Sequence, residues 1–173
     1  MTGGEAGDQV VSRWHPGEKI TEGLDGLRGR LAEYRQMGAR FAKWRAVIAV
    51  GDGIPQLGLH RCRRARAGPL RRAVPGEAGL VPVVEPEVLM DGAHTLQRCG
   101  EVTEELLRAV FTQLQAQRVT LEGVILKPAM VLPGSACPVQ DGVNEVARRG
   151  DVPAAGCARG RSRDRVPVRR AAR

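Results

Sequence analysis

The sequence predicts an α/β fold in which parallel strands alternate with the helices that cover them. The first observation is the order of elements: segments of helical periodicity alternate with short apolar runs, and the connections between them are short. The second is that the apolar runs are nearly continuous, which is typical of parallel strands buried on both faces. The chain has 173 residues, enough for one domain with a hydrophobic core.

The first half of the chain supplies one helix and two strands. A helix is predicted from Glu22, because its apolar side chains fall on one stripe, Leu24, Leu27, Leu31 and Tyr34. Gly38 follows the last turn, where a helix favours a residue that tolerates positive φ. Residues 41–50 are rich in apolar and β-branched residues and predict a strand that ends at the turn 51–53. Residues 80–85, Leu-Val-Pro-Val-Val-Glu, predict a second strand.

The second half supplies a long helix and a third strand. The helix is predicted from about Thr95 to Gln117, with an apolar stripe of Leu96, Cys99, Val102, Leu106, Val110 and Leu114. A third strand is predicted over residues 121–126 and leads directly into Lys127.

Ionisable side chains occur on all three predicted strands. Lys43 and Arg45 lie two residues apart, so they share one face of the first strand. Glu85 and Glu87 have the same spacing at the end of the second strand, and Lys127 closes the third. Such groups are costly to bury unless they pair or take part in chemistry, and catalytic residues of β/α barrels collect at the C-terminal ends of strands. The alternative is that the strands end in solvent and the charges are hydrated, but their recurrence on three successive strands favours a shared site.

The chemistry that suits these groups is imine formation. A lysine near other cations has its ammonium form disfavoured and becomes a better nucleophile towards a ketone. A carboxylate beside it can transfer protons while water is lost and a carbon–carbon bond is cleaved. An arginine can bind a phosphate group through two parallel hydrogen bonds.

Four motifs surround these residues. In order they are Gly-Leu-Asp-Gly-Leu at 23–27, Phe-Ala-Lys-Trp-Arg at 41–45, Val-Glu-Pro-Glu at 84–87 and Leu-Lys-Pro at 126–128. In their order and spacing they resemble the class I fructose-bisphosphate aldolases. The similarity covers about residues 15–52 and 78–146.

The resemblance implies a role for each charged residue. Lys127 would be the Schiff-base lysine and Glu85 the principal acid/base carboxylate. Glu87 and Lys43 would support them, and Arg45 would bind a phosphate of the substrate. Enzymes of this family act in glycolysis and gluconeogenesis, and they cleave fructose 1,6-bisphosphate to dihydroxyacetone phosphate and glyceraldehyde 3-phosphate. They use no metal or other cofactor and form homotetramers.

The resemblance also implies a fold, the TIM barrel of eight β/α units, of which the matched segments correspond to the fourth to sixth strands. Groups that the family places on other strands, among them an Asp, a Lys and a later Ser and Arg, have no counterpart here. Ala129 replaces the asparagine that follows Lys-Pro in the family. We expect a partial barrel with unpaired edges, and we expect this chain by itself to show no measurable aldolase activity.

The net charge of +8 comes from two arginine-rich segments. Six arginines lie in residues 61–72 and nine in 148–173, and the rest of the chain has more acids than bases. One permitted set of codons for residues 69–76, read one base later, encodes Arg-Tyr-Ala-Ala-Leu-Cys-Gln. This resembles the sequence of the family at the corresponding position. The tail can similarly yield the family's Ser-Gly-Gly-Gln. The hypothesis is that 57–77 and everything after about Ala147 are translated in the wrong frame.

The expected organisation has three parts. Residues 1–14 do not match the family, and residues 15–147 form the partial barrel domain. Residues 148–173 form a basic tail that we expect to be disordered.

A nucleic-acid-binding protein is the alternative from another class, because arginine clusters bind phosphate backbones. Aromatic residues make up 3% of the chain and none lies in the two basic segments, so nonspecific adhesion to RNA or DNA is expected rather than base stacking. The four cysteines lie far apart without a C-x-x-C pair, which suits neither a zinc site nor a disulfide framework. No apolar run is long enough to cross a membrane, and residues 1–14 lack the apolar stretch of a signal peptide, so a cytoplasmic protein is expected.

Overall fold

The computed structural model describes residues 8–11, 18–23, 25–55 and 79–150. The described elements, in chain order, are β1 (Asp8–Val11), β2 (Lys19–Glu22), α1 (Leu27–Gln36), β3 (Phe41–Ile48), β4 (Val81–Val88), α4 (Leu96–Ala116), the 3-10 helix η1 (Leu121–Gly123), β5 (Ile125–Leu126) and α5 (Val143–Gly150). The predicted out-of-frame segment 57–77, the predicted tail beyond residue 150 and Leu24 lie outside these residues.

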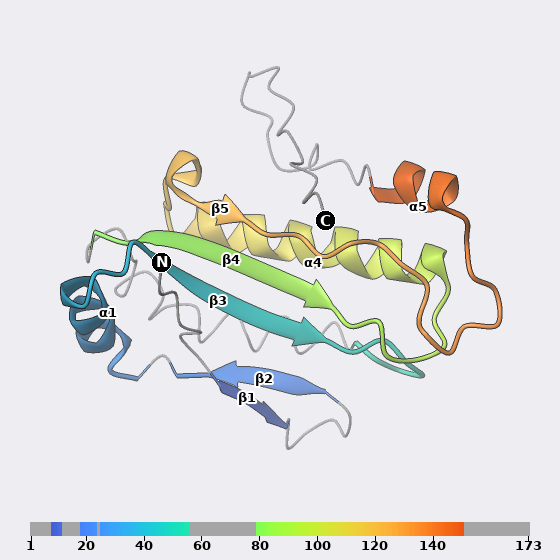
Figure 1. The fold of residues 1–173 in the computed structure, drawn as a ribbon, viewed down its shortest axis with the longest axis horizontal. Coiled ribbons are helices and arrows are strands. Elements are labelled where there is room, and N and C mark those ends of the chain that lie inside the picture. Colours follow the sequence, from blue (N-terminus) through green and yellow to red (C-terminus); the bar gives the residue numbers. More distant parts are fainter. Residues whose placement is uncertain (1–7, 12–17, 24, 56–78, 151–173) are drawn as a thin grey trace.

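The central sheet has three parallel strands in the order β3-β4-β5, and β1 and β2 form a separate antiparallel pair beside β3 (Figure 1). The α/β class with a parallel sheet is therefore confirmed. Phe41 pairs with Val81 and Ile48 with Val88, so β3 and β4 are in register over their whole length. β5 adds only two residues, opposite Val83 and Val84.

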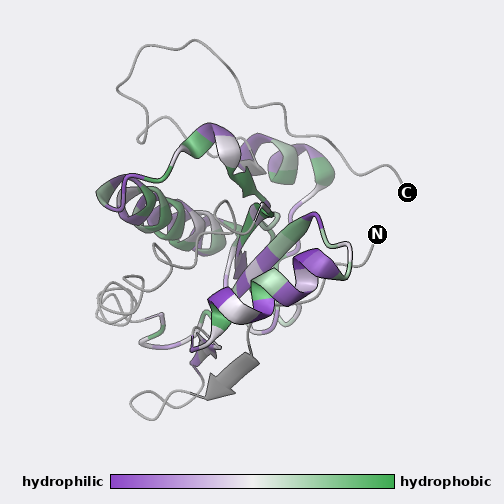
Figure 2. Ribbon diagram, turned by 90° about the vertical axis from the view of Figure 1, so that its left-hand side faces the viewer, coloured by the Kyte–Doolittle hydropathy of each residue, from purple (hydrophilic) through white to green (hydrophobic). Residues whose placement is uncertain are grey.

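The two faces of the sheet differ in character. The even-numbered residues of β3 and Val88 of β4 belong to the hydrophobic core or pack against it, whereas all four charged residues of these strands are odd-numbered. One part of the core joins the C-terminal half of the sheet to α4, and its buried members are Ile48, Val50, Val88, Leu96, Cys99, Val102, Leu106 and Val131. The other part joins the beginning of the sheet to α1, and its buried members are Leu27, Leu31, Ala39, Ala42 and Leu80. Hydrophilic residues interrupt the otherwise hydrophobic strands (Figure 2).

Two prolines lie in β4 although it is the central strand. The carbonyl oxygen of Val84 accepts a hydrogen bond from the backbone N–H of Lys127 at 2.9 Å, so even-numbered residues of β4 direct their backbone groups towards β5. The N–H groups that Pro82 and Pro86 lack would face the same side. Because these positions face β5 and not β3, the prolines remove no hydrogen bond between β3 and β4.

The helices begin and end where the sequence predicts, with one exception. Thr95 caps α4 by accepting a hydrogen bond from the backbone N–H of Arg98 at 3.2 Å, and Gln117 lies at its other end, as predicted. Gly38 follows α1 with a φ of 97°, as expected for a residue that ends a helix. The prediction that this first helix starts at Glu22 is wrong, because Glu22 ends β2 and the helix begins at Leu27.

Two strand predictions also need correction. β4 continues to Val88, so Glu85 and Glu87 lie inside the strand rather than at its end. The predicted strand over residues 121–126 is mostly wrong: its first half forms η1, and only Ile125–Leu126 pairs as a strand. Glu122 and Gly123 interrupt the apolar run, and residues of these types are poor strand formers.

Two loops cross at the C-terminal end of the sheet. Residues 89–95 follow β4, and residues 132–137 approach them closely enough for three backbone hydrogen bonds of 2.7–2.9 Å. We call this crossing the loop clasp. A side chain on Gly134 would collide with the carbonyl oxygen of Gly92, so only glycine fits there. Beyond the clasp, α5 packs against α4 through Val146, and the first three residues of the predicted tail lie within this helix.

Candidate active site

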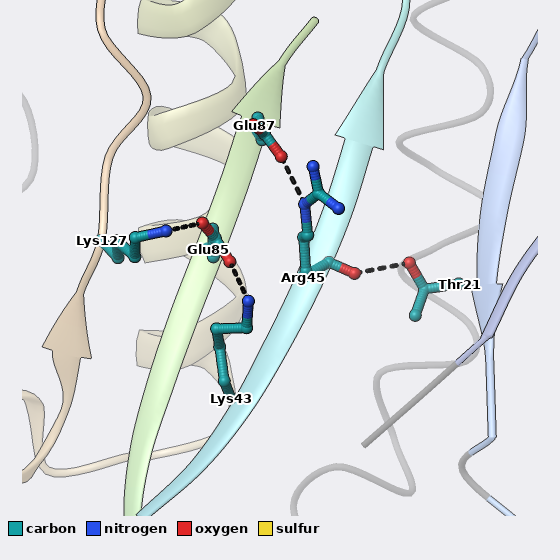
Figure 3. A network of polar contacts seen from close by, with 6 residues as sticks. All are labelled: Thr21, Lys43, Arg45, Glu85, Glu87 and Lys127. Atoms are coloured by element: carbon teal, nitrogen blue, oxygen red, sulfur yellow. Dashed lines mark hydrogen bonds and ion pairs between the residues drawn. The ribbon is translucent and has the colours of Figure 1, made fainter. Parts of the chain in front are cut away.

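The five charged residues predicted from the sequence lie together on one face of the sheet (Figure 3). Lys43 and Arg45 come from β3, Glu85 and Glu87 from β4, and Lys127 directly follows β5. Because the three strands are parallel and adjacent, residues far apart in sequence reach the same strip of the sheet.

Glu85 is the centre of the strip. Only 7% of its side chain is exposed, and a lysine contacts each of its two carboxylate oxygens. Lys127 donates a hydrogen bond from Nζ to Oε1, and the Nζ of Lys43 lies 2.9 Å from Oε2. Lys127 is more than half exposed, so its amine is held by Glu85 on one side and is accessible to solvent on the other.

The two lysines also determine the charge state of Glu85. Burial by itself raises the pKa of this carboxyl, but the ammonium groups of Lys127 and Lys43 outweigh burial and hold the pKa below its ordinary value. Glu85 is therefore a carboxylate at neutral pH. A carboxylate between two amines can accept a proton from one of them and return it later.

Arg45 and Glu87 form a second pair further along the same strip. Arg45 donates from Nε to Oε2 of Glu87, and about a third of each side chain is exposed. This contact fixes the plane of the guanidinium group, whose fork of donors suits a phosphate. The backbone carbonyl of Arg45 also accepts a hydrogen bond of 2.8 Å from the hydroxyl of Thr21 on β2.

Two features of this region escaped the sequence analysis. Nothing in the sequence indicated that Thr21 would contact β3, because a threonine in a short polar strand carries no such signal. His94, in the loop clasp, is 8% exposed, and neither of its ring nitrogens has a well-directed hydrogen bond among the described residues. A single histidine in a turn sequence gives no indication of its burial.

No group of three or more His, Cys, Asp or Glu side chains in the described part of the chain could hold a metal ion. None of the described helices is long and apolar enough to cross a membrane. Cys99 and Cys137 are buried free thiols.

Comparisons with known proteins agree with this arrangement. The model of the family described as "Fructose-bisphosphate aldolase class-I", of the glycolytic type, matches residues 8–152. A "Probable fructose-bisphosphate aldolase class 1" of Xanthomonas campestris is 56% identical over 134 residues, which are 76% of this chain and 39% of that protein. Human "Fructose-bisphosphate aldolase C" is 45% identical over 131 residues, covering 76% of this chain and 36% of its own.

A solved structure shows the same similarity in three dimensions. It is the fructose-bisphosphate aldolase of Plasmodium falciparum, in complex with TRAP and a small-molecule inhibitor, and it superimposes with a TM-score of 0.76 at 37% sequence identity. The match covers 86% of this chain and 43% of that one, so the described fold corresponds to part of the aldolase barrel. The chain spans less than half the length of the relatives named above. With a family match over most of its residues, the chain belongs to the class I fructose-bisphosphate aldolase family.

Proposed function

We propose that this site forms an imine between Lys127 and the ketone carbon of a sugar phosphate, and that its substrate is fructose 1,6-bisphosphate. The observation that supports this proposal is the contact of Glu85 with both Lys127 and Lys43 on one strip of the sheet. The products of the complete reaction would be dihydroxyacetone phosphate and glyceraldehyde 3-phosphate.

Imine formation needs a nucleophile and a group that moves protons. The neutral amine of Lys127 attacks the ketone carbon, and the electron pair of the C=O bond moves to oxygen, which takes up a proton from solvent. Glu85 accepts the proton that the amine loses and returns it to the hydroxyl group, which leaves as water. Lys43 stays beside the second carboxylate oxygen and keeps Glu85 in its reactive ionised form.

Cleavage of the carbon–carbon bond follows from the same intermediate. The iminium accepts the electron pair of the breaking bond as a carboxylate removes the proton of the adjacent hydroxyl group, and the enamine is later protonated and hydrolysed. In this proposal Arg45, oriented by Glu87, binds a phosphate of the substrate. In this proposal the described residues carry out the imine-forming step, but we do not expect turnover by the 173-residue chain alone, because the parallel sheet of the described residues has three of the eight strands of a barrel.

The test is to trap the imine. The chain has three lysines, Lys19, Lys43 and Lys127, so a covalent adduct can be assigned to one of them by peptide mass spectrometry. With dihydroxyacetone phosphate and borohydride we expect reduction of an adduct on Lys127. Lys127→Met should abolish it, and Glu85→Gln should slow it by about a hundredfold or more, the usual loss for a positioned proton-transfer group.

Lys19→Met is the matched control, since it removes an exposed lysine outside the strip. It should trap at the wild-type rate. An adduct distributed equally over the three lysines, or none at all, contradicts the assignment of Lys127. Cleavage of fructose 1,6-bisphosphate by the purified chain would contradict the expectation that it does not turn over by itself.

A further inference from the structure

We propose that Thr21 is a positioning residue that holds Arg45 in place through its backbone. This inference rests on the proposed function, in which Arg45 binds a phosphate. The hydroxyl of Thr21 donates to the main-chain carbonyl of Arg45, so it acts on the backbone of this residue.

The direction of the β3 carbonyls explains why a support is needed. The carbonyl groups of Arg40 and Ile48 point towards β4. They accept hydrogen bonds from the backbone N–H groups of Val81 and Leu89, each at 2.9 Å. Backbone groups alternate in direction along a strand, so the carbonyl of Arg45, an odd-numbered residue, points away from β4. β3 has no further strand of the parallel sheet on this side among the described elements.

Thr21 supplies the partner that a strand would otherwise provide. Its hydroxyl donates to the Arg45 carbonyl at 2.8 Å across 24 residues of sequence, and it does so from β2, which lies along this edge (Figure 3). Thr21 is itself half-buried, so water competes less for the hydrogen bond than it would at an exposed site.

Arg45 is thus held at two points. Glu87 on β4 holds its guanidinium group, and Thr21 on β2 holds its carbonyl on the opposite edge of the strand. If the second hold is lost, the strand can move at Arg45, and the guanidinium moves with it relative to Glu87. A displacement of this kind is what weakens binding by a positioned group.

Inorganic phosphate and the Nε–H of Arg45 provide a direct test on the full chain. The NMR signal of this N–H, identified by its loss in Arg45→Lys, reports the contact with Glu87, and its shift during a phosphate titration gives a Kd. In Thr21→Val we expect faster solvent exchange of the N–H and a Kd about fivefold higher, the effect of one lost hydrogen bond. Thr21→Ser, which keeps the hydroxyl, should restore both values.

Thr112→Val is the matched control, because it removes a threonine-to-carbonyl hydrogen bond of 2.7 Å on the exposed side of α4. It should leave the Arg45 signal and the Kd unchanged. Thr21 has no positioning role if Thr21→Val behaves like the wild type, or if Thr112→Val and Thr21→Val change both readouts equally. If Thr21→Val shows the expected changes but no adduct is trapped on Lys127, only the proposed imine chemistry is refuted, because the Arg45 signal does not depend on it.

Discussion

Glu85 shows what decides the behaviour of a single charged residue in this fold. Its position inside a strand exposes it to the cost of burial, and two lysines reverse the direction in which burial alone would shift its pKa. Spacing in the sequence was enough to predict that these groups would meet, because parallel strands bring equivalent positions together. It was not enough to predict which cation would contact which oxygen, since that depends on side-chain conformations.

His94 presents the opposite case, a titratable residue whose pKa no charged group among the described residues shifts. Burial lowers its pKa, and a backbone contact with Leu132 offsets only part of that shift. In the folded protein the imidazole of His94 thus stays neutral at pH values where the same imidazole is already protonated in the unfolded chain. Stability contributed by the neutral ring is complete above the unfolded pKa of about 6.5 and is lost as the pH falls below it.

We therefore expect the free energy of unfolding to decrease between pH 7 and pH 5, by at most about 1.4 kcal/mol per pH unit from this residue. Urea denaturation at several pH values measures it. In His94→Gln the slope over this range should become smaller. A slope that is the same in both proteins would show that His94 does not titrate differently in the folded and unfolded states.

At the level of elements, the helices were easier to predict than the strands. The apolar stripe and the cap at Thr95 defined α4 almost to the residue, because both signals are local. The β1–β2 pair and α5 were not predicted, and β5 is shorter than its apolar run indicated. β5 and α5 contact elements that are distant in sequence, β4 and α4, and local composition does not record such contacts.

The loop clasp is an element whose geometry can be tested by one methyl group. Gly134→Ala places a Cβ against the carbonyl of Gly92, which is backbone and cannot rotate away, so we expect a loss of about 1–3 kcal/mol of stability. Gly29→Ala is the control: it lies in α1 with no atom within 4 Å of the added Cβ, and should stabilise by about 0.5–1 kcal/mol. Chemical denaturation of both variants measures the difference. Equal effects of the two substitutions would mean that the loops separate without cost.

At the scale of the whole molecule, the segments that form the described fold are not the segments that give the chain its net positive charge. The excess of arginine lies in the segments 61–72 and 148–173, and nearly all of these residues lie outside the described structure. The family match extends over residues 8–152 and therefore spans the segment 61–72. The sequence alone was sufficient to separate the folded segments from the arginine-rich ones, because the arginine-rich segments show no hydrophobic periodicity.

Reading the coding DNA in all three frames tests the origin of these segments. We expect the next frame to encode Arg-Tyr-Ala-x-x-Cys-Gln near residues 69–76 and Ser-Gly-Gly-Gln in the tail. Unrelated text in that frame would mean that the arginines were selected as protein. Specific nucleic-acid binding would then become the stronger hypothesis, and its sign would be sequence preference that persists at moderate salt.

The charged strip has a consequence for how the strands choose their alignment. If β3 slipped by two residues along β4, every side chain would keep its face, so hydrophobic patterning alone does not oppose the slip. In one direction Lys43 would move past Glu85, and in the other Arg45 would lose Glu87. Either shift leaves a carboxylate of β4 without its cation on β3, and for the buried Glu85 this loss is costly. The charged groups that we propose for catalysis would thus also destabilise misaligned pairings of β3 with β4 during folding.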